Sequence, residues 1–403
     1  MTTMIDNEQK TLNVPNLRFP EFEGEWEECR LGEIGKLYKG VGISKDQLSD
    51  NGEPCILYGE LYTKYKSEVI NEVISKTNIS DNKLVRSNAN DVIIPCSGET
   101  AEDIATARCV LNDNVLLGGD LNIIRLHKDN GLFMSYQLNG KRKYDIARVS
   151  QGVSVVHLYG EHLKGIKTYC PNLDEQNKIA TFLSLLDERI ATQNKIIDKL
   201  ESLIKGICNN YFLKLSHSQE MKSIRLGDIL KERNEYCCKD GTFVHGTLSK
   251  DGLFPKTERW NRDFLVKEEN KKYKITHLDD ICYNPANLKF GVICRNIYGD
   301  LIFSPIYVTF EVSKKVNIGF IELYLTNRNF IEKIRKFEQG TVYERMSVSP
   351  EDFLSYKIRI PSSSEQTFFY QKIQRLKNCS QNELEHLNLY KKLRQYLLRQ
   401  MFI

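Results

Sequence analysis

The sequence predicts an α+β protein. Two similar mixed α/β domains are expected to be separated by two long helices, which pack as an antiparallel coiled coil with pseudo-twofold symmetry. Three observations support this fold. Segments of the chain recur about 190 residues later, each recurrence leads into a long heptad pattern, and strand-like runs lie between glycine-containing loops at 91–95, 121–126 and 306–312. A direct repeat can close on itself about a pseudo-twofold axis when its helices run antiparallel.

The composition is that of a folded protein. Hydrophobic residues make up 41% and charged residues 27% of the 403 residues, which excludes a disordered chain and allows two or three domains. The first ten residues contain no apolar core and no run of 18 apolar residues occurs, so we expect neither a signal peptide nor a membrane span. The 11 cysteines contain no Cys-x-x-Cys pair, which favours reduced thiols in a cytoplasmic protein.

The repeat divides the chain into four parts. These are a globular domain, a long helix, a second globular domain and a second long helix, over residues 1–171, 172–215, 216–361 and 362–403. The segment RLGEI from Arg30 returns as RLGDI from Arg225, and PNLDEQ from Pro171 returns as PSSSEQ from Pro361. The two domains share these terminal segments, but the sequences between the segments differ. One scaffold is therefore expected to present two different recognition surfaces.

The first long helix is expected from about Leu173 to Leu213. The spacing of Asn172 and Glu175 predicts a capping box. The apolar positions that follow alternate in steps of four and three, with Gln193 the one polar position. A heptad pattern over more than four repeats predicts a coiled coil. The predicted packing residues are Ile179, Leu183, Leu186, Ile190, Ile197, Leu200, Ile204, Ile207 and Tyr211.

The second long helix is expected from about Glu365 to Met401. Ser362 and Glu365 repeat the capping box, and the middle of the heptad pattern is polar at Ser380 and Glu383. Each helix could instead lie on the surface of its own domain. About 40 residues exceed what one small domain covers, so we favour two helices packed on each other. The predicted packing residues are Phe369, Ile373, Leu376, Leu387, Tyr390, Leu397 and Met401.

Motifs of catalytic and metal sites are missing from the sequence. We find no phosphate-binding P-loop, no His-Glu-x-x-His metal motif and no Gly-x-Ser-x-Gly nucleophile motif, and the seven histidines lack metal-ligand spacing. The turn at Asn284 resembles the Asn-Pro-Pro-aromatic turn of amino-methyltransferases, but it lacks the second proline and the aromatic residue, so a strand end is expected there. We therefore expect no catalytic residue and no metal site.

Four sequence features occur together and in a fixed order. They are Pro15–Phe22 followed by Gly24-Glu25-Trp26, then Arg30–Ile34, then Gln151–Ser154 ahead of Leu158, and the Pro-x-x-x-Glu-Gln turn before each long helix. In this combination the chain resembles the specificity (S) subunits of type I restriction-modification systems. The resemblance covers the whole chain, including the order of its four parts.

The resemblance implies a function in bacterial defence. Each domain would be a target recognition domain that reads one half of a split DNA sequence, and the helices would set the gap and dock the methyltransferase subunits. The implied partners are double-stranded DNA, two modification subunits and, for cleavage, restriction subunits. Base flipping, adenine methylation and ATP-dependent cleavage would belong to those partners. S-adenosylmethionine, ATP and Mg²⁺ would be bound by them too, with no cofactor in this non-catalytic chain.

Two other functions remain open from the sequence alone. One is a stand-alone regulator with two DNA-binding modules, and the other is a coiled-coil scaffold that only joins proteins. No helix-turn-helix or zinc-finger pattern is present, and the net charge of +4 is low for a protein that binds DNA alone. Residues 1–171 carry more acidic than basic residues. Partner subunits are therefore expected to supply much of the phosphate contact.

Candidate DNA-contacting residues are chosen by residue type and loop position. A solvated surface position is the alternative for each, and an exposed β-hairpin face is the alternative for the segment 58–66, in which aromatic residues alternate with lysines. In the first domain the candidates are Lys39, Lys45, Tyr58, Tyr62, Lys64, Lys66, Ser97, Thr100, Gln151 and Ser154. In the second domain they are Lys250, Arg259, Arg262, Asn287, Lys289, Arg295, Gln339, Thr341 and Arg345.

Overall fold

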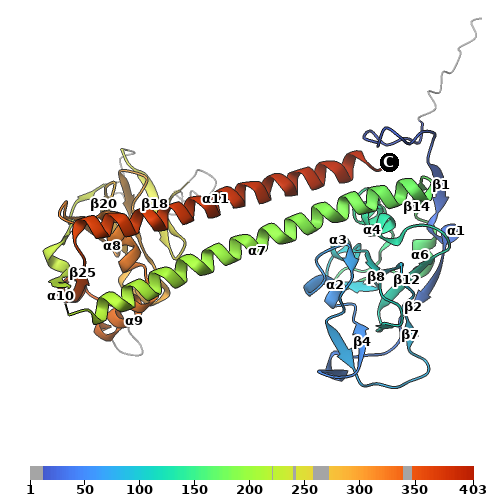
Figure 1. Cartoon of the computed structure of the whole chain (residues 1–403), viewed down its shortest axis with the longest axis horizontal. Coiled ribbons are helices and arrows are strands. Elements are labelled where there is room, and N and C mark those ends of the chain that lie inside the picture. Colours follow the sequence, from blue (N-terminus) through green and yellow to red (C-terminus); the bar gives the residue numbers. More distant parts are fainter. Residues whose placement is uncertain (1–11, 220, 239–241, 257–271, 339–346) are drawn as a thin grey trace, which may run out of the picture. The chain divides into compact units, whose positions relative to one another are not determined.

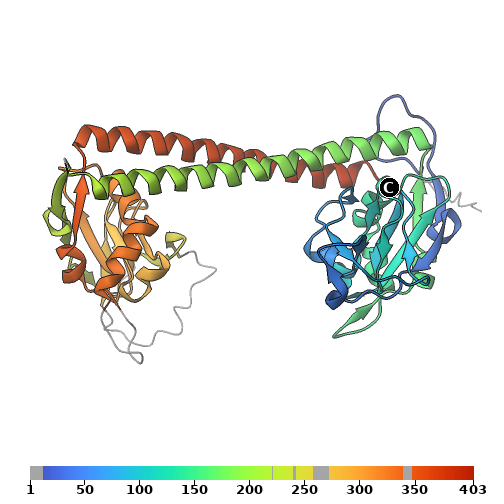
Figure 2. The same cartoon turned by 60° about the horizontal axis from the view of Figure 1, so that its bottom comes forward.

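The computed structural model describes residues 12–219, 221–238, 242–256, 272–338 and 347–403. The chain divides into two compact units, which share both long helices (Figures 1 and 2). The N-terminal unit comprises residues 1–194 and 385–403, and the C-terminal unit comprises residues 195–384. Each unit contains one mixed α/β domain and a part of each long helix. The predicted architecture of two mixed domains and two long helices is confirmed.

A five-stranded sheet forms the centre of the N-terminal domain. Its strands are, in order, β2 (Gly35–Lys39), β12 (Leu121–Leu126), β8 (Asp91–Pro95), β10 (Arg108–Val110) and β5 (Val69–Ile70). The predicted strands 91–95 and 121–126 coincide with β8 and β12. Successive side chains of a strand point to opposite faces, and both faces are covered here. Val92 and Ile94 lie in one apolar cluster and Ile93 in another, so every residue of β8 is buried.

A second sheet and short helices complete this domain. The second sheet has the order β3 (Leu48–Ser49), β6 (Ser75–Thr77), β4 (Glu53–Ile56), β11 (Leu116–Leu117) and β7 (Val85–Arg86). Two antiparallel pairs are β1 (Glu27–Arg30) with β14 (Lys167–Cys170) and β9 (Ser97–Gly98) with β13 (Val156–His157). The helices are α1 (Leu31–Ile34), α2 (Glu60–Thr63), α3 (Ala101–Ile104), α4 (Gly131–Asn139), α5 (Lys143–Val149) and α6 (Gly160–Lys164), with a 3-10 turn η1 (Lys45–Gln47).

The C-terminal domain also has two sheets. One has the order β16 (Leu230–Glu232), β24 (Val308–Val312), β21 (Ile281–Tyr283) and β22 (Ile293–Arg295). The other has the order β17 (Tyr236–Cys237), β20 (Tyr273–Thr276), β23 (Leu301–Phe303), β18 (Val244–Ser249) and β19 (Gly252–Pro255). The strand expected at 306–312 begins only at Val308, because the Tyr307 N–H closes a turn on the Ser304 carbonyl at 3.1 Å.

The remaining elements of this domain flank the sheets. β15 (Lys222–Arg225) pairs antiparallel with β25 (Lys357–Ile360), as β1 pairs with β14 in the first domain. The helices and 3-10 turns are α8 (Ile318–Leu325), α9 (Arg328–Ile334), α10 (Pro350–Ser355), η2 (Leu226–Asp228), η5 (Pro285–Phe290) and η6 (Arg335–Phe337). Asn284 follows β21 and caps η5 through its side chain, so the expected strand end is confirmed.

The repeated glutamine at the start of each long helix ties that helix to its domain. The Gln176 side chain donates to the Pro171 carbonyl at 2.9 Å and accepts from the Asn130 N–H at 2.9 Å. Asn130 is the N-cap of α4. Gln366 makes the equivalent two hydrogen bonds, also at 2.9 Å, to Pro361 and to the N-cap of α8. The Pro-x-x-x-Glu-Gln repeat is therefore a structural joint in which the glutamine makes the same two hydrogen bonds in both units.

The capping box predicted at the start of the first long helix is only half formed. The Asn172 side chain accepts from the Glu175 N–H at 2.9 Å. The Glu175 carboxylate, however, is buried and accepts from the Arg18 guanidinium at 2.7 and 2.8 Å. In the second long helix Ser362 and Glu365 bond each other reciprocally, at 3.0 and 3.4 Å. Arg18 thus binds the carboxylate that would otherwise complete the capping box of the first helix.

The two long helices are α7 (Leu173–His217) and α11 (Ser363–Gln400). In the N-terminal unit, Ile179 and Leu183 near the start of α7 share an apolar cluster with Met401 and Phe402 at the end of the chain. In the C-terminal unit the end of α7 shares a cluster with the start of α11, and the rings of Tyr211 and Phe369 stack with centroids 3.8 Å apart. Within each unit the helices therefore run antiparallel (Figure 1).

Burial along the helices follows the predicted heptad pattern with one departure. The buried packing residues are Phe369, Ile179, Leu183, Ile373, Leu387, Leu397 and Met401. The half-buried packing residues are Leu186, Ile190, Ile197, Leu200, Ile204, Tyr211, Leu376 and Tyr390. The assignment of Ile207 is wrong, because Ile207 is exposed and Cys208 is buried in its place. In a straight α-helix, residues seven positions apart differ by about 20° around the helix axis. Four heptads after Ile179 the difference is almost the angle between neighbouring residues, so the buried face has moved on by one position.

His277 in the C-terminal domain lies between two carboxylates. His277 Nδ1 lies 2.8 Å from Asp300 Oδ1, and His277 Nε2 lies 3.1 Å from Glu235 Oε2. Partial burial and the nearby Arg233 disfavour a charged imidazole, but the hydrogen bonds to the two carboxylates outweigh them and raise the pKa of His277. The protonated ring donates to both carboxylates, whereas the neutral ring can donate to only one of them.

We expect the C-terminal unit to lose stability as pH rises above about 6.5, the ordinary pKa of histidine. Because the folded state raises the pKa of His277, its contribution is complete below that value and is lost as pH rises through the folded pKa. Urea unfolding at a series of pH values on both sides of the ordinary histidine pKa measures this. The His277→Gln variant should lack that part of the pH dependence, while His217→Gln, at an exposed position, should retain it. An unchanged profile in His277→Gln would contradict the assignment.

Candidate nucleic-acid interface

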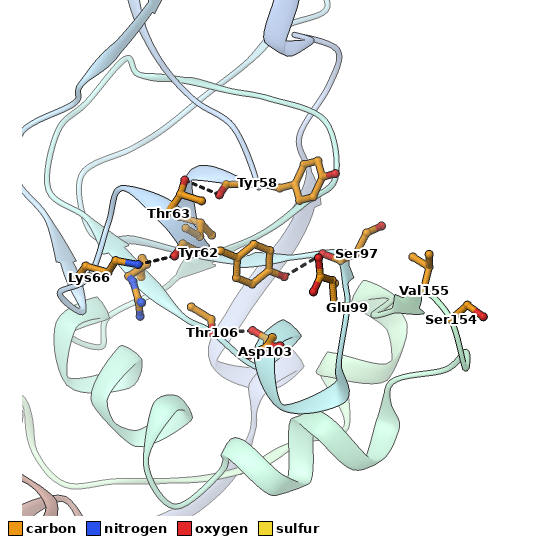
Figure 3. A pocket seen from close by; sticks show the side chains of 14 residues that line it. Tyr58, Tyr62, Thr63, Lys66, Ser97, Glu99, Asp103, Thr106, Ser154 and Val155 are labelled. Carbon is orange, nitrogen blue, oxygen red and sulfur yellow. Dashed lines mark hydrogen bonds between the residues drawn. The ribbon is translucent and has the colours of Figure 1, made fainter. Parts of the chain in front are cut away.

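The N-terminal domain contains a pocket of about 740 Å³. Its walls come from α2, the β9–α3 segment, and the loop before β13 (Figure 3). Tyr62 lies across it, and the Tyr62 hydroxyl donates to the Ser97 carbonyl at 2.9 Å. Ser154 and Val155 approach from the loop on the other side. Segments far apart in the chain therefore meet in one pocket, named here the α2–β9 pocket.

Within the segment 58–66, residues Glu60–Thr63 form the helical turn α2, so the alternative of an exposed β-hairpin face is wrong. The buried Glu60 carboxylate holds this turn by accepting from the Leu57 N–H at 3.0 Å and from Lys64 Nζ at 2.7 Å. Lys66 follows this turn, and Lys66 Nζ donates to the Tyr62 carbonyl at 2.6 Å. Both line the pocket.

The loop 151–155 is closed by main-chain bonds. Gln151 and His157 exchange N–H···O bonds of 2.9 and 2.7 Å. Gly152 has φ +119°, and a Cβ there would lie 2.1 Å from the Val155 carbonyl oxygen, so only glycine fits. This tight loop leaves Ser154 exposed beside Ser97 of β9, whose hydroxyl lies 3.3 Å from His157 Nδ1.

The pocket lining mixes aromatic, hydroxyl and charged groups. Lys66 and Arg108 carry positive charge, whereas Glu99 and Asp103 carry negative charge. Burial lowers the pKa of Arg108, and burial raises the pKa of Tyr62, which keeps its hydroxyl protonated as a donor. Such a lining can stack on and hydrogen-bond to the edges of planar polar groups, including bases.

Half of the candidates in the first domain line the α2–β9 pocket: Tyr58, Tyr62, Lys66, Ser97 and Ser154. Thr100 is the N-cap of α3 beside it, and Gln151 closes the loop above it. Lys39 and Lys45 are exposed outside the lining. Lys64 bonds Glu60 and Ser75 instead. Sequence reasoning missed Arg108, Glu99 and Asp103, although the Thr100–Asp103 spacing is a helix-start signal.

The second domain places its described candidates on three separate elements. Asn287 and Lys289 lie in η5, where Lys289 Nζ is 5.2 Å from the centroid of the exposed Phe290 ring. Lys250 is exposed in the β18–β19 turn. The Arg295 side chain pairs with Asp279, with Nε at 2.8 Å from Oδ1. The candidates outside the described residues are Arg259, Arg262, Gln339, Thr341 and Arg345.

The described residues form neither a metal-binding cluster nor a helix suited to cross a membrane. Within the described part of the chain, no group of three or more His, Cys, Asp or Glu side chains could hold a metal ion. None of the helices described is both long and apolar enough to cross a membrane.

Comparison with known proteins relates the chain to one family. Residues 23–202 match the type I restriction modification DNA specificity domain. The MjaVIII type I restriction enzyme specificity subunit of Methanocaldococcus jannaschii is 23% identical over 400 residues, which cover 92% of this chain and 90% of that protein.

Two solved structures share the fold. The S subunit of a type I restriction-modification system from M. genitalium has a TM-score of 0.59 at 17% identity, covering 97% of this chain and 99% of that one. A chain from a structure of type I restriction-modification complex assembly has a TM-score of 0.56 at 13% identity, covering 94% of this chain and 97% of that one. The predicted family resemblance is confirmed.

Proposed function

We infer that this chain is the DNA sequence-specificity subunit of a type I restriction-modification complex, the family to which its sequence relates it. The observation that carries this inference is the match along nearly the whole length of a specificity subunit. The duplicated architecture supports it, because two similar domains on shared helices suit a split target. None of the matches above is to a transcription regulator, so the stand-alone regulator loses its support.

We propose that each domain reads one half of the target and that the helices carry the methyltransferase subunits. Adenine methylation and ATP-dependent cleavage would then be performed by partner subunits with S-adenosylmethionine, ATP and Mg²⁺, and this chain would be non-catalytic. The test is a methylation assay. The purified chain alone should not methylate DNA, and adding its modification subunits should produce adenine methylation at one split sequence. Methyl transfer by the chain alone would refute the proposal.

We further propose that the α2–β9 pocket contributes to reading the first half-site. Three features support this: the exposed face of Tyr58, the exposed Ser154 at the loop tip, and the positive charge of Lys66 in the same lining. Hydroxyl and aromatic groups at the rim can reach base edges, and lysine can reach phosphate.

The double variant Tyr58→Ala/Ser154→Ala should weaken binding of the assembled complex to its target by about thirtyfold or more, since two good base contacts at roughly 1–3 kcal/mol each sum to at least about 2 kcal/mol. Fluorescence anisotropy with the split site measures this. Discrimination should relax at the first half-site only, and substitutions in the second half-site should cost as much as before. Lys83→Ala, at an exposed position outside the pocket that is not a candidate contact, is the control. Equal losses in the control and in the double variant would contradict the assignment.

A further inference from the structure

Arg394, near the end of the chain, holds two carboxylates of the N-terminal unit. Its Nη2 lies 2.6 Å from Glu68 Oε2, and its Nε lies 2.5 Å from Asp187 Oδ1. The buried Tyr136 hydroxyl donates to the other oxygen of Asp187 at 2.8 Å. The side chains of Glu68, Asp187 and Arg394 are only 7%, 13% and 24% exposed. We call these four residues the Arg394 cluster.

The cluster depends on the charge of Arg394. Burial opposes ionisation of Glu68, but the positive charge of Arg394 outweighs it and lowers the pKa of Glu68. Arg108 is the other cation that acts on Glu68, but its guanidinium is bonded to the carbonyls of Tyr65 and Ala107. Without Arg394, two buried carboxylates would lose the cation with which both are paired, and unpaired buried charge is strongly destabilising.

The ends of the two long helices bury matching apolar residues. At the repeat offset of about 190 residues, Phe212 of α7 corresponds to Phe402, which directly follows α11. Phe402 packs on Phe133 of α4 with ring centroids 5.2 Å apart, and Phe212 packs on Phe320 of α8 at 5.6 Å. Cys208 and Leu398 are buried one turn earlier in each helix. Apolar packing alone would therefore let the end of α7 from a second copy replace the end of α11 in the N-terminal unit.

The same offset breaks this equivalence at the charged positions. Ile204 stands where α11 has Arg394, and Ile204 packs against the apolar core of the C-terminal unit. Lys377 stands where α7 has Asp187, and its positive charge acts on Cys208 and Glu322 in that unit. If two copies exchanged helices, Ile204 would face Glu68 and Asp187, and Arg394 would face Lys377. Both exchanged pairings are unfavourable, which is how charges select partners in coiled coils.

We propose that Arg394 selects the helix partner: it makes the end of α11 complete the N-terminal unit of its own chain, and it prevents exchange of helices with a second copy. Each chain then carries one first domain and one second domain on the same helix pair. This selection is a property of the chain itself and does not depend on DNA or on partner subunits.

Moving the arginine tests the proposal in the full-length chain. The double variant is Ile204→Arg/Arg394→Ile. If its helices pair within one chain, Glu68 and Asp187 lose their cation and the introduced guanidinium is buried in the apolar core of the C-terminal unit. If two copies exchange helices, the introduced arginine restores both ion pairs. Two differently tagged copies are expressed together, and the fraction of the second tag captured with the first is measured. We expect an increase of about tenfold over the wild-type chain, which corresponds to about 1.4 kcal/mol. Capture at the wild-type level by a folded variant would overturn the proposal.

Single variants separate exchange from simple destabilisation. Arg394→Ile alone should lower the stability of the N-terminal unit without matching the capture of the double variant. Should the double variant fail to fold, Glu68→Gln/Asp187→Asn/Arg394→Leu provides the second test, because removing all three charges leaves apolar packing to choose between partners. Capture should then rise above the wild-type level, and unchanged capture would overturn the proposal.

Discussion

Replacing Phe402 with alanine is expected to destabilise the N-terminal unit by about 3–5 kcal/mol, the usual cost of deleting a buried phenylalanine ring. The residue is the penultimate one of the chain, yet it is only 1% exposed. Its ring centroid lies 5.2 Å from that of Phe133 and 6.3 Å from that of Trp26. The core of the first domain is therefore completed by residues that directly follow α11.

Tryptophan fluorescence can assign this loss to the N-terminal unit. Trp26 and Trp260 are the two tryptophans of the sequence, so a Trp260→Phe background leaves Trp26 as the only reporter. Urea unfolding followed by Trp26 should shift strongly in Phe402→Ala. The control is Tyr396→Ala, an aromatic residue of α11 in the same unit but 54% exposed, where a change within about 0.5 kcal/mol is expected. Similar effects of the two substitutions would contradict the packing described for Phe402.

Lengthening both long helices by one heptad is expected to widen the gap between the two half-sites by about three base pairs. Seven residues add roughly 10 Å of helix, and one base-pair step is about 3.4 Å. The insertions belong after Asn194 and after Leu384, where α7 and α11 pass from one unit to the other. The contacts inside each unit then remain, so both half-sequences should stay unchanged. This prediction depends on the proposed function, and mapping methylated adenines checks it.

A single insertion serves as the control. In the N-terminal unit Asp187 of α7 pairs with Arg394 of α11, and in the C-terminal unit Tyr211 stacks on Phe369. A heptad added to α7 alone lengthens only one of the two segments that connect these pairs, so both pairs cannot be kept. We expect reduced stability and little methylation. If the double insertion leaves the gap unchanged, the helices do not set it.

The sequence by itself determined the features that depend on local pattern. β8 and β12 were predicted with their bounds, because strands buried on both faces are continuous apolar runs. The two long helices were predicted because 3.5-residue periodicity persists over about 40 residues. The Pro-x-x-x-Glu-Gln repeat also marked both helix starts, although its purpose, a bond from Gln176 to the N-cap of α4, is visible only in the structure.

The tertiary structure decided whatever depends on partners distant in the chain. Glu175 was expected in a capping box, but Arg18, 157 residues away, takes its carboxylate. The α2–β9 pocket joins Tyr62 to Ser154, and the Arg394 cluster joins Glu68 to Arg394. The spacing of apolar residues along a helix or strand specifies which side chains are buried, because the backbone geometry sets which positions share a face. It does not specify which distant charge or ring each side chain meets, because that choice is made by the packing of whole elements.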